Sequence, residues 1–268
     1  MDSVIEQLQH RFGQEAPLSV TRGRVHDYLG MRIDFSQPGQ VIFSMESYIE
    51  QILIECPEGL GQGPASTPAA AHLFEVDINA RKLTDEARET FHHLVAQLLY
   101  LSKRCRPDLQ TAISFLCTRV QQPDIDDYWK LNRCLAYLRS KTKDMVLTLE
   151  ASDATQIKWW VDVSFGVHPD LRSHTGATMT LGRGCPISMS LKQKLNTRSS
   201  TEAELVGVND AMSLILWTRM FLTSQGFSVT DNVVFQDNRQ STMKSSCKTT
   251  ESDRAERKLD ISTYATTS

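Results

Sequence analysis

Three carboxylates in the second half of the chain have the residue type and spacing of metal ligands. Asp162 lies at the end of the strand pattern 157–163, Glu204 lies near the start of a long helical pattern, and Asp237 follows the apolar run 233–236. If the later strand lies parallel to the earlier one, Asp162 and Asp237 emerge at the same sheet edge, and a crossover helix can present Glu204 over both.

Three carboxylates brought this close repel one another unless a cation lies between them. Hard oxygen ligands favour Mg²⁺, and a pair of such ions, or of Mn²⁺ ions, stabilises the attacking and leaving oxygens of a phosphodiester displacement. The three positions therefore predict a metal site with Asp162, Glu204 and Asp237 as ligands.

Each carboxylate also has a structural interpretation. Asp162 could simply end a strand. Glu204 could form a capping box with Thr201, and Glu202 could pair likewise with Ser199, since both pairs fit the S/T-x-x-E pattern. Asp237 and Asn238 could form an Asx turn. Residue types and spacing alone leave both interpretations open.

Basic residues are concentrated between positions 103 and 143, where the sequence has nine basic and four acidic residues. A local excess of this size can contact phosphates, although the solvated face of a helix has the same pattern. The residues predicted to bind nucleic acid are Lys103, Arg104, Arg106, Arg119, Lys130, Arg133 and Arg139.

The first half of the chain alternates between short elements of both kinds. Helical spacing predicts a helix over residues 4–12, and a period of two over 29–35 and 41–45 predicts a β-hairpin, followed by a helix over 47–56. Glycine and proline over 57–80 predict a linker. Three helices, expected over residues 84–101, 107–120 and 124–140, would form a small bundle.

In the second half, strand patterns precede one long helix and a last strand follows it. Strands are expected over 145–149, 157–163, 177–181 and 186–191, then a helix over 200–225 and a strand over 233–236. From residue 244 to 268 the polar composition predicts weak order. These patterns predict a mixed α/β fold.

Composition sets further limits. Apolar residues make up 40% and charged residues 23% of the chain, and the net charge of −3 argues against a general nucleic-acid coat. There is no unbroken run of 18 apolar residues, so we expect no membrane partner. Six scattered cysteines and an N-terminus without the features of a secretory signal predict a cytoplasmic or nuclear protein that is not secreted.

Several motifs, in the right order, resemble copia-type retrotransposon Pol polyproteins. Residues 193–205, which read Gln-Lys-Leu-Asn-Thr-Arg-Ser-Ser-Thr-Glu-Ala-Glu-Leu, closely resemble the helix-start motif of that family's ribonuclease H domain. Its strand motifs resemble residues 160–165, 173–177 and 235–238. Parts of its reverse transcriptase resemble residues 28–31, 48–53, 98–101 and 106–109.

The resemblance implies a fold and a function. It implies the end of a reverse-transcriptase palm over 1–57, as a β-hairpin plus helix, and helices of the thumb and connection over 58–145. A ribonuclease H-like domain with a mixed five-stranded sheet would occupy 146–268. The implied activity is metal-dependent hydrolysis of the RNA strand of an RNA–DNA hybrid, with the remainder of the Pol polyprotein as a further partner.

The resemblance also assigns site residues. Asp162, Glu204 and Asp237 match the family's three core metal ligands, and Glu204 is preferred over Glu202 because the ligand sits in the Ala-Glu-aliphatic step. Asp260, in the late motif 257–261, is the candidate for a fourth catalytic position.

The chain also departs from the family pattern. Lys258 replaces the usual histidine of the late motif, Ser164 stands where a second acidic residue is common, and residues 244–254 fit poorly. These departures favour an alternative, a catalytically inactive transposon relic that at most binds nucleic acid.

Polymerase activity is not expected from this chain alone. The Tyr-x-Asp-Asp turn of reverse transcriptases does not occur anywhere in the sequence. A further alternative, a host protein that reuses the fold for protein binding, would require an exposed apolar patch away from the acidic edge.

Overall fold

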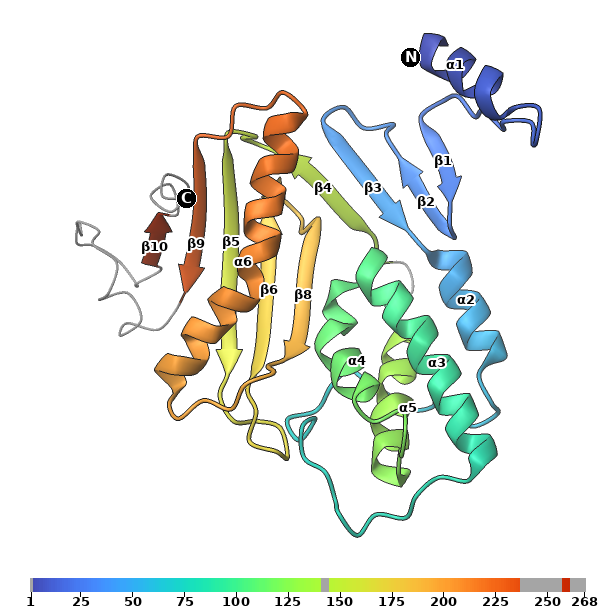
Figure 1. The fold of residues 1–268 in the computed structure, drawn as a ribbon. Helices are drawn as coiled ribbons and strands as arrows, with labels where there is room; N and C mark the ends of the chain where they lie inside the picture. The colour runs from blue at the N-terminus through green and yellow to red at the C-terminus, as the bar shows by residue number, and fades with distance from the viewer. Residues whose placement is uncertain (1, 141–144, 237–256, 261–268) are drawn as a thin grey trace.

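The computed structural model describes residues 2–140, 145–236 and 257–260. Within these residues it has six α-helices and two five-stranded sheets, which confirms the mixed α/β class. The elements form two lobes that lie beside each other (Figure 1). The first lobe is built around the sheet β1-β2-β3-β4-β7 and the second around the sheet β10-β9-β5-β6-β8.

The first lobe begins with α1 (Asp2–Phe12) and an antiparallel meander. Its strands are β1 (Val25–Tyr28), β2 (Met31–Asp34) and β3 (Gln40–Ser44), and α2 (Glu46–Glu55) follows. The predicted hairpin is therefore confirmed as β2 and β3. Strand β1 was missed, because its turn into β2 runs through Leu29 and Gly30, both with positive φ, and leucine does not signal such a turn.

The three-helix bundle is confirmed. It consists of α3 (Asp85–Arg104), α4 (Gln110–Cys117) after a 3₁₀ turn at Pro107–Leu109, and α5 (Ile125–Arg139). The Thr84 hydroxyl accepts a hydrogen bond from the Ala87 amide at the start of α3, and Asp124 forms a reciprocal capping box with Asp127 at the start of α5. These caps explain why the helix starts were predictable from sequence.

The segment 57–80 contains no helix or strand, as predicted. It is nevertheless packed on the bundle, because Leu60 and Leu73 are buried and the Gly61 amide donates to Asn132 Oδ1 of α5 at 2.6 Å. The segment is therefore part of the first lobe's core.

Strand β4 (Leu147–Ala151) belongs to the first lobe. The sequence placed it with the following strands, but it pairs antiparallel with β3, from Phe43 opposite Leu147 to Gln40 opposite Glu150. The two-residue strand β7 (Gly182–Arg183) then pairs with β4. Two strands from the second half of the chain thus complete the first sheet.

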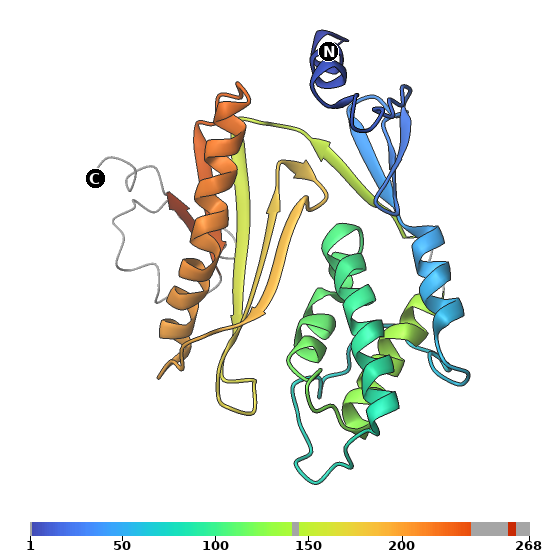
Figure 2. The same ribbon diagram turned by 45° about the vertical axis from the view of Figure 1, so that its right-hand side comes forward.

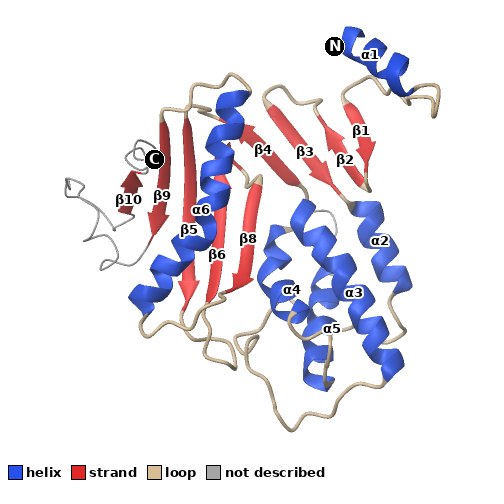
Figure 3. Ribbon diagram, in the orientation of Figure 1, coloured by secondary structure: helices blue, strands red, loops and turns tan. Residues whose placement is uncertain are grey.

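The second lobe contains a mixed sheet covered by one long helix. The sheet consists of β5 (Gln156–Ser164), β6 (His174–Thr180), β8 (Ile187–Lys192), β9 (Asp231–Gln236) and β10 (Arg257–Asp260). Strands β5 and β9 are parallel, as predicted, and the other neighbours are antiparallel. The helix α6 (Ser200–Ser224) connects β8 to β9 and lies across the sheet (Figure 3).

Helix α6 buries one face of this sheet. Ile157, Trp159 and Val161 of β5 pack in the core with Ala211 and Ile215 of α6. The alternate residues of β5 therefore point to the other face, because side chains alternate along a strand.

By length and composition alone, α6 is also apolar enough to cross a membrane. Its buried side chains lie against the sheet, which is the position of a core helix in a globular protein. Its outward face carries the exposed side chains of Trp217, Met220 and Phe221, with the two aromatic rings stacked at 5.1 Å. This is the kind of apolar surface that the protein-binding alternative requires.

The two lobes contact each other through α4 and β8, which lie side by side in Figures 1 and 2. Gln110 Nε2 of α4 donates to Ser188 Oγ at 2.6 Å, and the Ser114 hydroxyl donates to the Ser190 carbonyl at 2.8 Å. These contacts between α4 and β8 are polar, and the Ser188 side chain lies on the sheet face away from α6.

Candidate functional site

Asp162 lies near the end of β5 on the sheet face away from α6. It is exposed, whereas Val161 before it is buried under the helix. One oxygen of its carboxylate accepts the Val163 amide at 2.9 Å. The carboxylate lines a groove between the sheet and α4, together with Trp160 and Thr178 of the same lobe. Asp162 is thus open to a ligand approaching between the lobes.

Glu204 lies in the second turn of α6, on the side facing the sheet. It is 8% exposed, and its carboxylate accepts a hydrogen bond from Gln236 Nε2 at 2.8 Å. The same amide group donates to the Glu204 carbonyl at 2.9 Å. Because Gln236 is the last residue of β9, these contacts fix the start of α6 at that end of the strand.

The parallel pairing of β5 and β9 ends close to both carboxylates. Its last pair is Trp160 with Phe235, so Gln236 lies at the level of Val161, one residue before Asp162. Asp162 and Glu204 therefore approach one sheet margin from opposite faces. A shared cation would have to lie at the margin itself, beyond the last β5–β9 pair.

A buried hydrogen-bond network, not predicted from sequence, positions the start of α6. Gln193 Nε2 donates to Thr175 Oγ1 at 3.0 Å and to the carbonyl of Ala203 at 2.9 Å, one residue before Glu204. The Thr175 hydroxyl donates to Asp210 at 3.2 Å, and burial raises the pKa of that carboxyl. Gln193 lies within the motif 193–205, but nothing in its residue type distinguishes a buried amide from an exposed one.

Glycine is also needed where α6 crosses the sheet. A Cβ atom at Gly207 would lie 2.4 Å from Val163 Cγ2, which is closer than carbon atoms pack. Glycine at this position therefore allows α6 to lie close to β5 at Val163, the residue that follows Asp162.

Ser199 and Glu202 cap the start of α6, as their spacing predicted, but not as a reciprocal capping box. Ser199 is the N-cap of α6 and accepts the Glu202 amide at 3.2 Å, while Glu202 accepts the Arg198 amide at 2.8 Å. Glu202 is therefore engaged with the helix start, in agreement with the choice of Glu204 as the candidate ligand.

The other two predicted site residues are not placed. Asp237 lies outside the described residues, as does most of the tail 244–268, and Asp260 is described only as the backbone end of β10. Within the described residues no group of three histidine, cysteine, aspartate or glutamate side chains could hold a metal ion. The shared metal site remains a prediction, as does the fourth position.

Three of the predicted nucleic-acid contacts require correction. Arg106 is 1% exposed and forms a two-pronged contact with Asp108, at 2.9 and 2.6 Å. Lys130 is 7% exposed and pairs with Asp126 at 2.7 Å. Arg119 contacts both acidic residues of the α5 capping box, at 3.1 and 3.0 Å. These three basic side chains are therefore engaged by acidic partners within the first lobe.

The other four predicted nucleic-acid contacts form two groups, one that holds the segment 57–80 and one that is exposed. Arg133 donates to the carbonyl and hydroxyl of Thr67, and Arg139 donates to the Gly61 carbonyl, so both hold the segment 57–80 in place. Lys103 and Arg104 are exposed at the end of α3, where Arg104 lies over the Tyr100 ring at 5.5 Å. These two remain available to phosphates.

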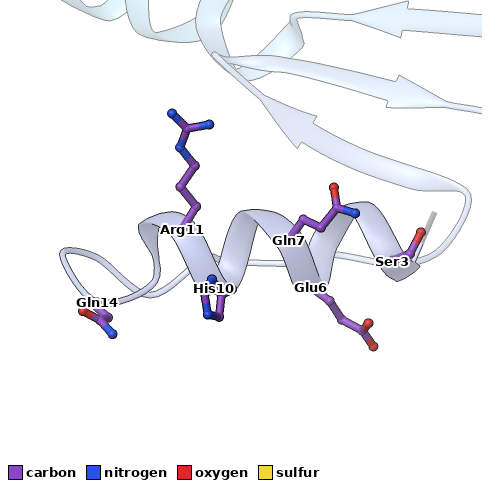
Figure 4. Close-up of a pocket in the computed structure, with 6 residues that line it drawn as sticks. All are labelled: Ser3, Glu6, Gln7, His10, Arg11 and Gln14. Atoms are coloured by element: carbon purple, nitrogen blue, oxygen red, sulfur yellow. The ribbon is translucent and has the colours of Figure 1, made fainter.

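The surface around α1 does not form a site. None of the residues of this helix is buried, and Figure 4 shows its polar side chains, such as Glu6 and Arg11, pointing away from one another. No converging set of chemical groups is present there.

Comparison with known proteins gives the class of the chain. No protein-family model and no solved structure matches it. Curated proteins encoded by retrotransposons do match, at 28–33% identity over most of the chain. The chain belongs to the copia-type retrotransposon Pol polyproteins, of which it corresponds to a part.

Three of these relatives show the extent of the similarity. The Pol polyprotein of transposon TNT 1-94 from Nicotiana tabacum is 28% identical over 81% of this chain, which is 17% of that protein. The putative transposon Ty5-1 protein of Saccharomyces cerevisiae is 28% identical over 71% of the chain and 61% of its own length. The Pol polyprotein of transposon RE1 from Arabidopsis thaliana is 30% identical over 80% of the chain and 14% of its own length.

Proposed function

We propose that the second lobe hydrolyses the RNA strand of RNA–DNA hybrids with the aid of Mg²⁺ or Mn²⁺. The proposal is supported chiefly by the position of two carboxylates: Asp162 on the central strand β5, and Glu204 on the helix that crosses over to the parallel strand β9. Membership of a Pol polyprotein family supports a nucleic-acid substrate. The proposed setting is a cytoplasmic or nuclear one, as part of a larger polyprotein.

The carboxylate oxygens fit a hard divalent cation, and bound metal ions would supply a nucleophilic water and neutralise charge on the scissile phosphate. Asp162 is exposed and available as a ligand on the groove side. Glu204 is held by Gln236 and would act from the helix side, with Asp237 as the third predicted ligand. The Gln193 network keeps the start of α6 in position during the reaction.

The direct test is hydrolysis of an end-labelled RNA–DNA hybrid by the whole chain in Mg²⁺. The wild-type chain should cut the RNA strand, and Asp162→Asn should lower the rate at least 100-fold because the substituted amide lacks the charge that binds the cation. Asp170→Asn, which changes an exposed carboxylate in the following loop, is the matched control and should cut at a rate close to wild type.

The relic interpretation predicts a different outcome. It is supported by Lys258, Ser164 and the poor match of residues 244–254. Equal and negligible cutting by the wild-type chain and by Asp162→Asn, with hybrid binding retained, would establish it and reject the nuclease proposal.

A further inference from the structure

The groove beside Asp162 is formed by both lobes. It has a volume of about 270 Å³ and is lined on one side by Pro107, Gln110 and Thr111, next to and within α4. Its other side is lined by Trp160 and Asp162 of β5 and by Thr178 of β6, all pointing away from α6. Its shape therefore depends on how the two lobes pack.

The lining is almost entirely uncharged. Among the described residues that line the groove, Asp162 is the only charged one, and none of them is a lysine or an arginine. A groove whose single charge is negative repels phosphate, so the phosphates of a bound strand would lie outside it. Neutral hydroxyl and amide groups, by contrast, suit a ribose edge, because a 2′-hydroxyl both donates and accepts hydrogen bonds.

The hydroxyl groups of the groove differ in availability. Ser188 and Gln110 are bonded to each other across the lobe interface at 2.6 Å, so they hold the walls together. Thr178 is exposed at the level of Trp160 on the neighbouring strand. Thr111 is also exposed, but its Oγ1 accepts a hydrogen bond from Ser190 Oγ at 3.4 Å, so Thr178 is the hydroxyl better placed to meet a ligand.

Trp160 supplies a rigid apolar wall. Its ring stacks on Phe235 of β9, with the ring centroids 5.1 Å apart and the planes inclined by 19°. The stacking holds a half-buried indole on the same face as Asp162, two residues earlier in the strand. A fixed aromatic surface of this kind can stack on a base or pack against a sugar.

We propose that this groove binds one ribonucleotide of the RNA strand, with its sugar edge toward Thr178 and its sugar or base packed on Trp160. Trp160 is then a positioning residue that brings the strand to Asp162, and Thr178 favours RNA over DNA. The inference rests on the proposed function for the identity of the substrate. It adds the residues that select and place the RNA strand.

Binding can be tested separately from cleavage. Fluorescence anisotropy of a labelled RNA–DNA hybrid is measured with the full chain in EDTA, where no hydrolysis occurs. Trp160→Ala should weaken binding about 5- to 150-fold, the range expected from loss of one base-stacking contact. Trp160→Phe, which keeps an aromatic ring over Phe235, should recover most of the affinity.

Trp217→Ala is the matched control, because Trp217 is an exposed tryptophan on the outer face of α6. It should bind the hybrid as wild type does. Equal affinities for Trp160→Ala, Trp217→Ala and wild type would overturn the groove proposal, even if Asp162→Asn abolishes cleavage. Conversely, weak binding by Trp160→Ala alone would support the groove even if the wild-type chain cuts nothing.

The second measurement is the preference of the chain for an RNA–DNA hybrid over a DNA duplex. Thr178→Val keeps the shape of the side chain but removes its hydroxyl, so it should reduce the preference for hybrid over DNA duplex by about 3- to 10-fold, the loss of one hydrogen bond. Thr223→Val, on the exposed side of α6, should leave that preference unchanged. An unchanged preference in Thr178→Val would reject the role assigned to this hydroxyl.

Discussion

At the scale of single residues, burial decides which charges can act. The sequence shows Arg106 and Lys130 as part of a basic surface, yet both are buried in the first lobe. Arg106 lies over the Tyr137 ring at 5.5 Å, and the Tyr137 hydroxyl donates to the same Asp108 at 2.9 Å. Loss of the buried guanidinium would leave the partly exposed Asp108 carboxylate without its hydrogen-bond donors.

Arg106→Gln should therefore destabilise the protein by about 1–3 kcal/mol, because the carboxylate that it leaves behind is partly exposed. Chemical denaturation of the variant and of Arg104→Gln, at an exposed position close by, would measure this difference. Only the Arg106 variant should lose stability. A loss of hybrid affinity in Arg106→Gln without a loss of stability would contradict the structural role.

Gly207 offers a second test at this scale. Alanine normally stabilises a helix interior relative to glycine by about 1 kcal/mol. Here its methyl group would clash with Val163, so Gly207→Ala should instead destabilise the protein by about 1–3 kcal/mol. Ser213→Ala, at an exposed position of α6, is the control and should be neutral or slightly stabilising in thermal unfolding. A stabilised Gly207→Ala would show that α6 does not approach β5 this closely.

At the scale of elements, the helices were predictable and some strands were not. Helix starts carry their own chemical signals, such as Thr84 and Asp124, whose side chains accept helical amides. Strand partners carry no such signal. The apolar alternation of β4 identifies a strand, but only the folded chain shows that it pairs with β3, about 100 residues earlier. Pairing between distant segments depends on tertiary packing, which local patterns do not encode.

The end of α3 is the element at which phosphate contact is best tested. Lys103 and Arg104 are exposed there, whereas most of the other predicted contacts are engaged internally. The double variant Lys103→Gln/Arg104→Gln should weaken hybrid binding and lower the slope of log affinity against log salt by about 1–2. A matched double variant, Arg81→Gln/Arg88→Gln, removes two basic residues elsewhere on the first lobe. Identical salt slopes for both variants would reject the end of α3 as a phosphate contact.

At the scale of the whole molecule, the sequence predicted the parallel pairing of β5 and β9 but not the two-sided approach of the carboxylates. The parallel pairing was predictable because a long helix between two strands favours a crossover connection. The approach of the two carboxylates from opposite sides depends on which face of the sheet each side chain points to. Val161 and Asp162 are neighbours in β5 and point to opposite faces of the sheet. A shift of one residue in the strand register would therefore exchange the faces to which they point.

The lobes are also joined by a pair of buried histidines. His168 Nε2 lies 3.0 Å from His174 Nδ1, and His174 Nε2 lies 2.7 Å from Ser190 Oγ of β8. Phe74 of the first lobe packs against both rings, at 5.0 and 5.1 Å. Burial lowers the pKa of each histidine to about 4, and the positive charge of Lys192 lowers the pKa of His168 further, against the opposing effect of Asp170.

Acid should therefore weaken the molecule at this interface. The unfolded histidines titrate near pH 6.5 and the folded ones near 4, so the unfolded state binds more protons between these values and stability falls as the pH drops through that range. The free energy of unfolding should decrease by roughly 2–4 kcal/mol from pH 7 to 4.5, beyond the effect of carboxylates. His174→Gln should flatten the dependence in urea denaturation, whereas His93→Gln, at an exposed position of α3, should not. The same steep loss in His174→Gln as in wild type would mean that the histidine pair does not control how the lobes respond to acid.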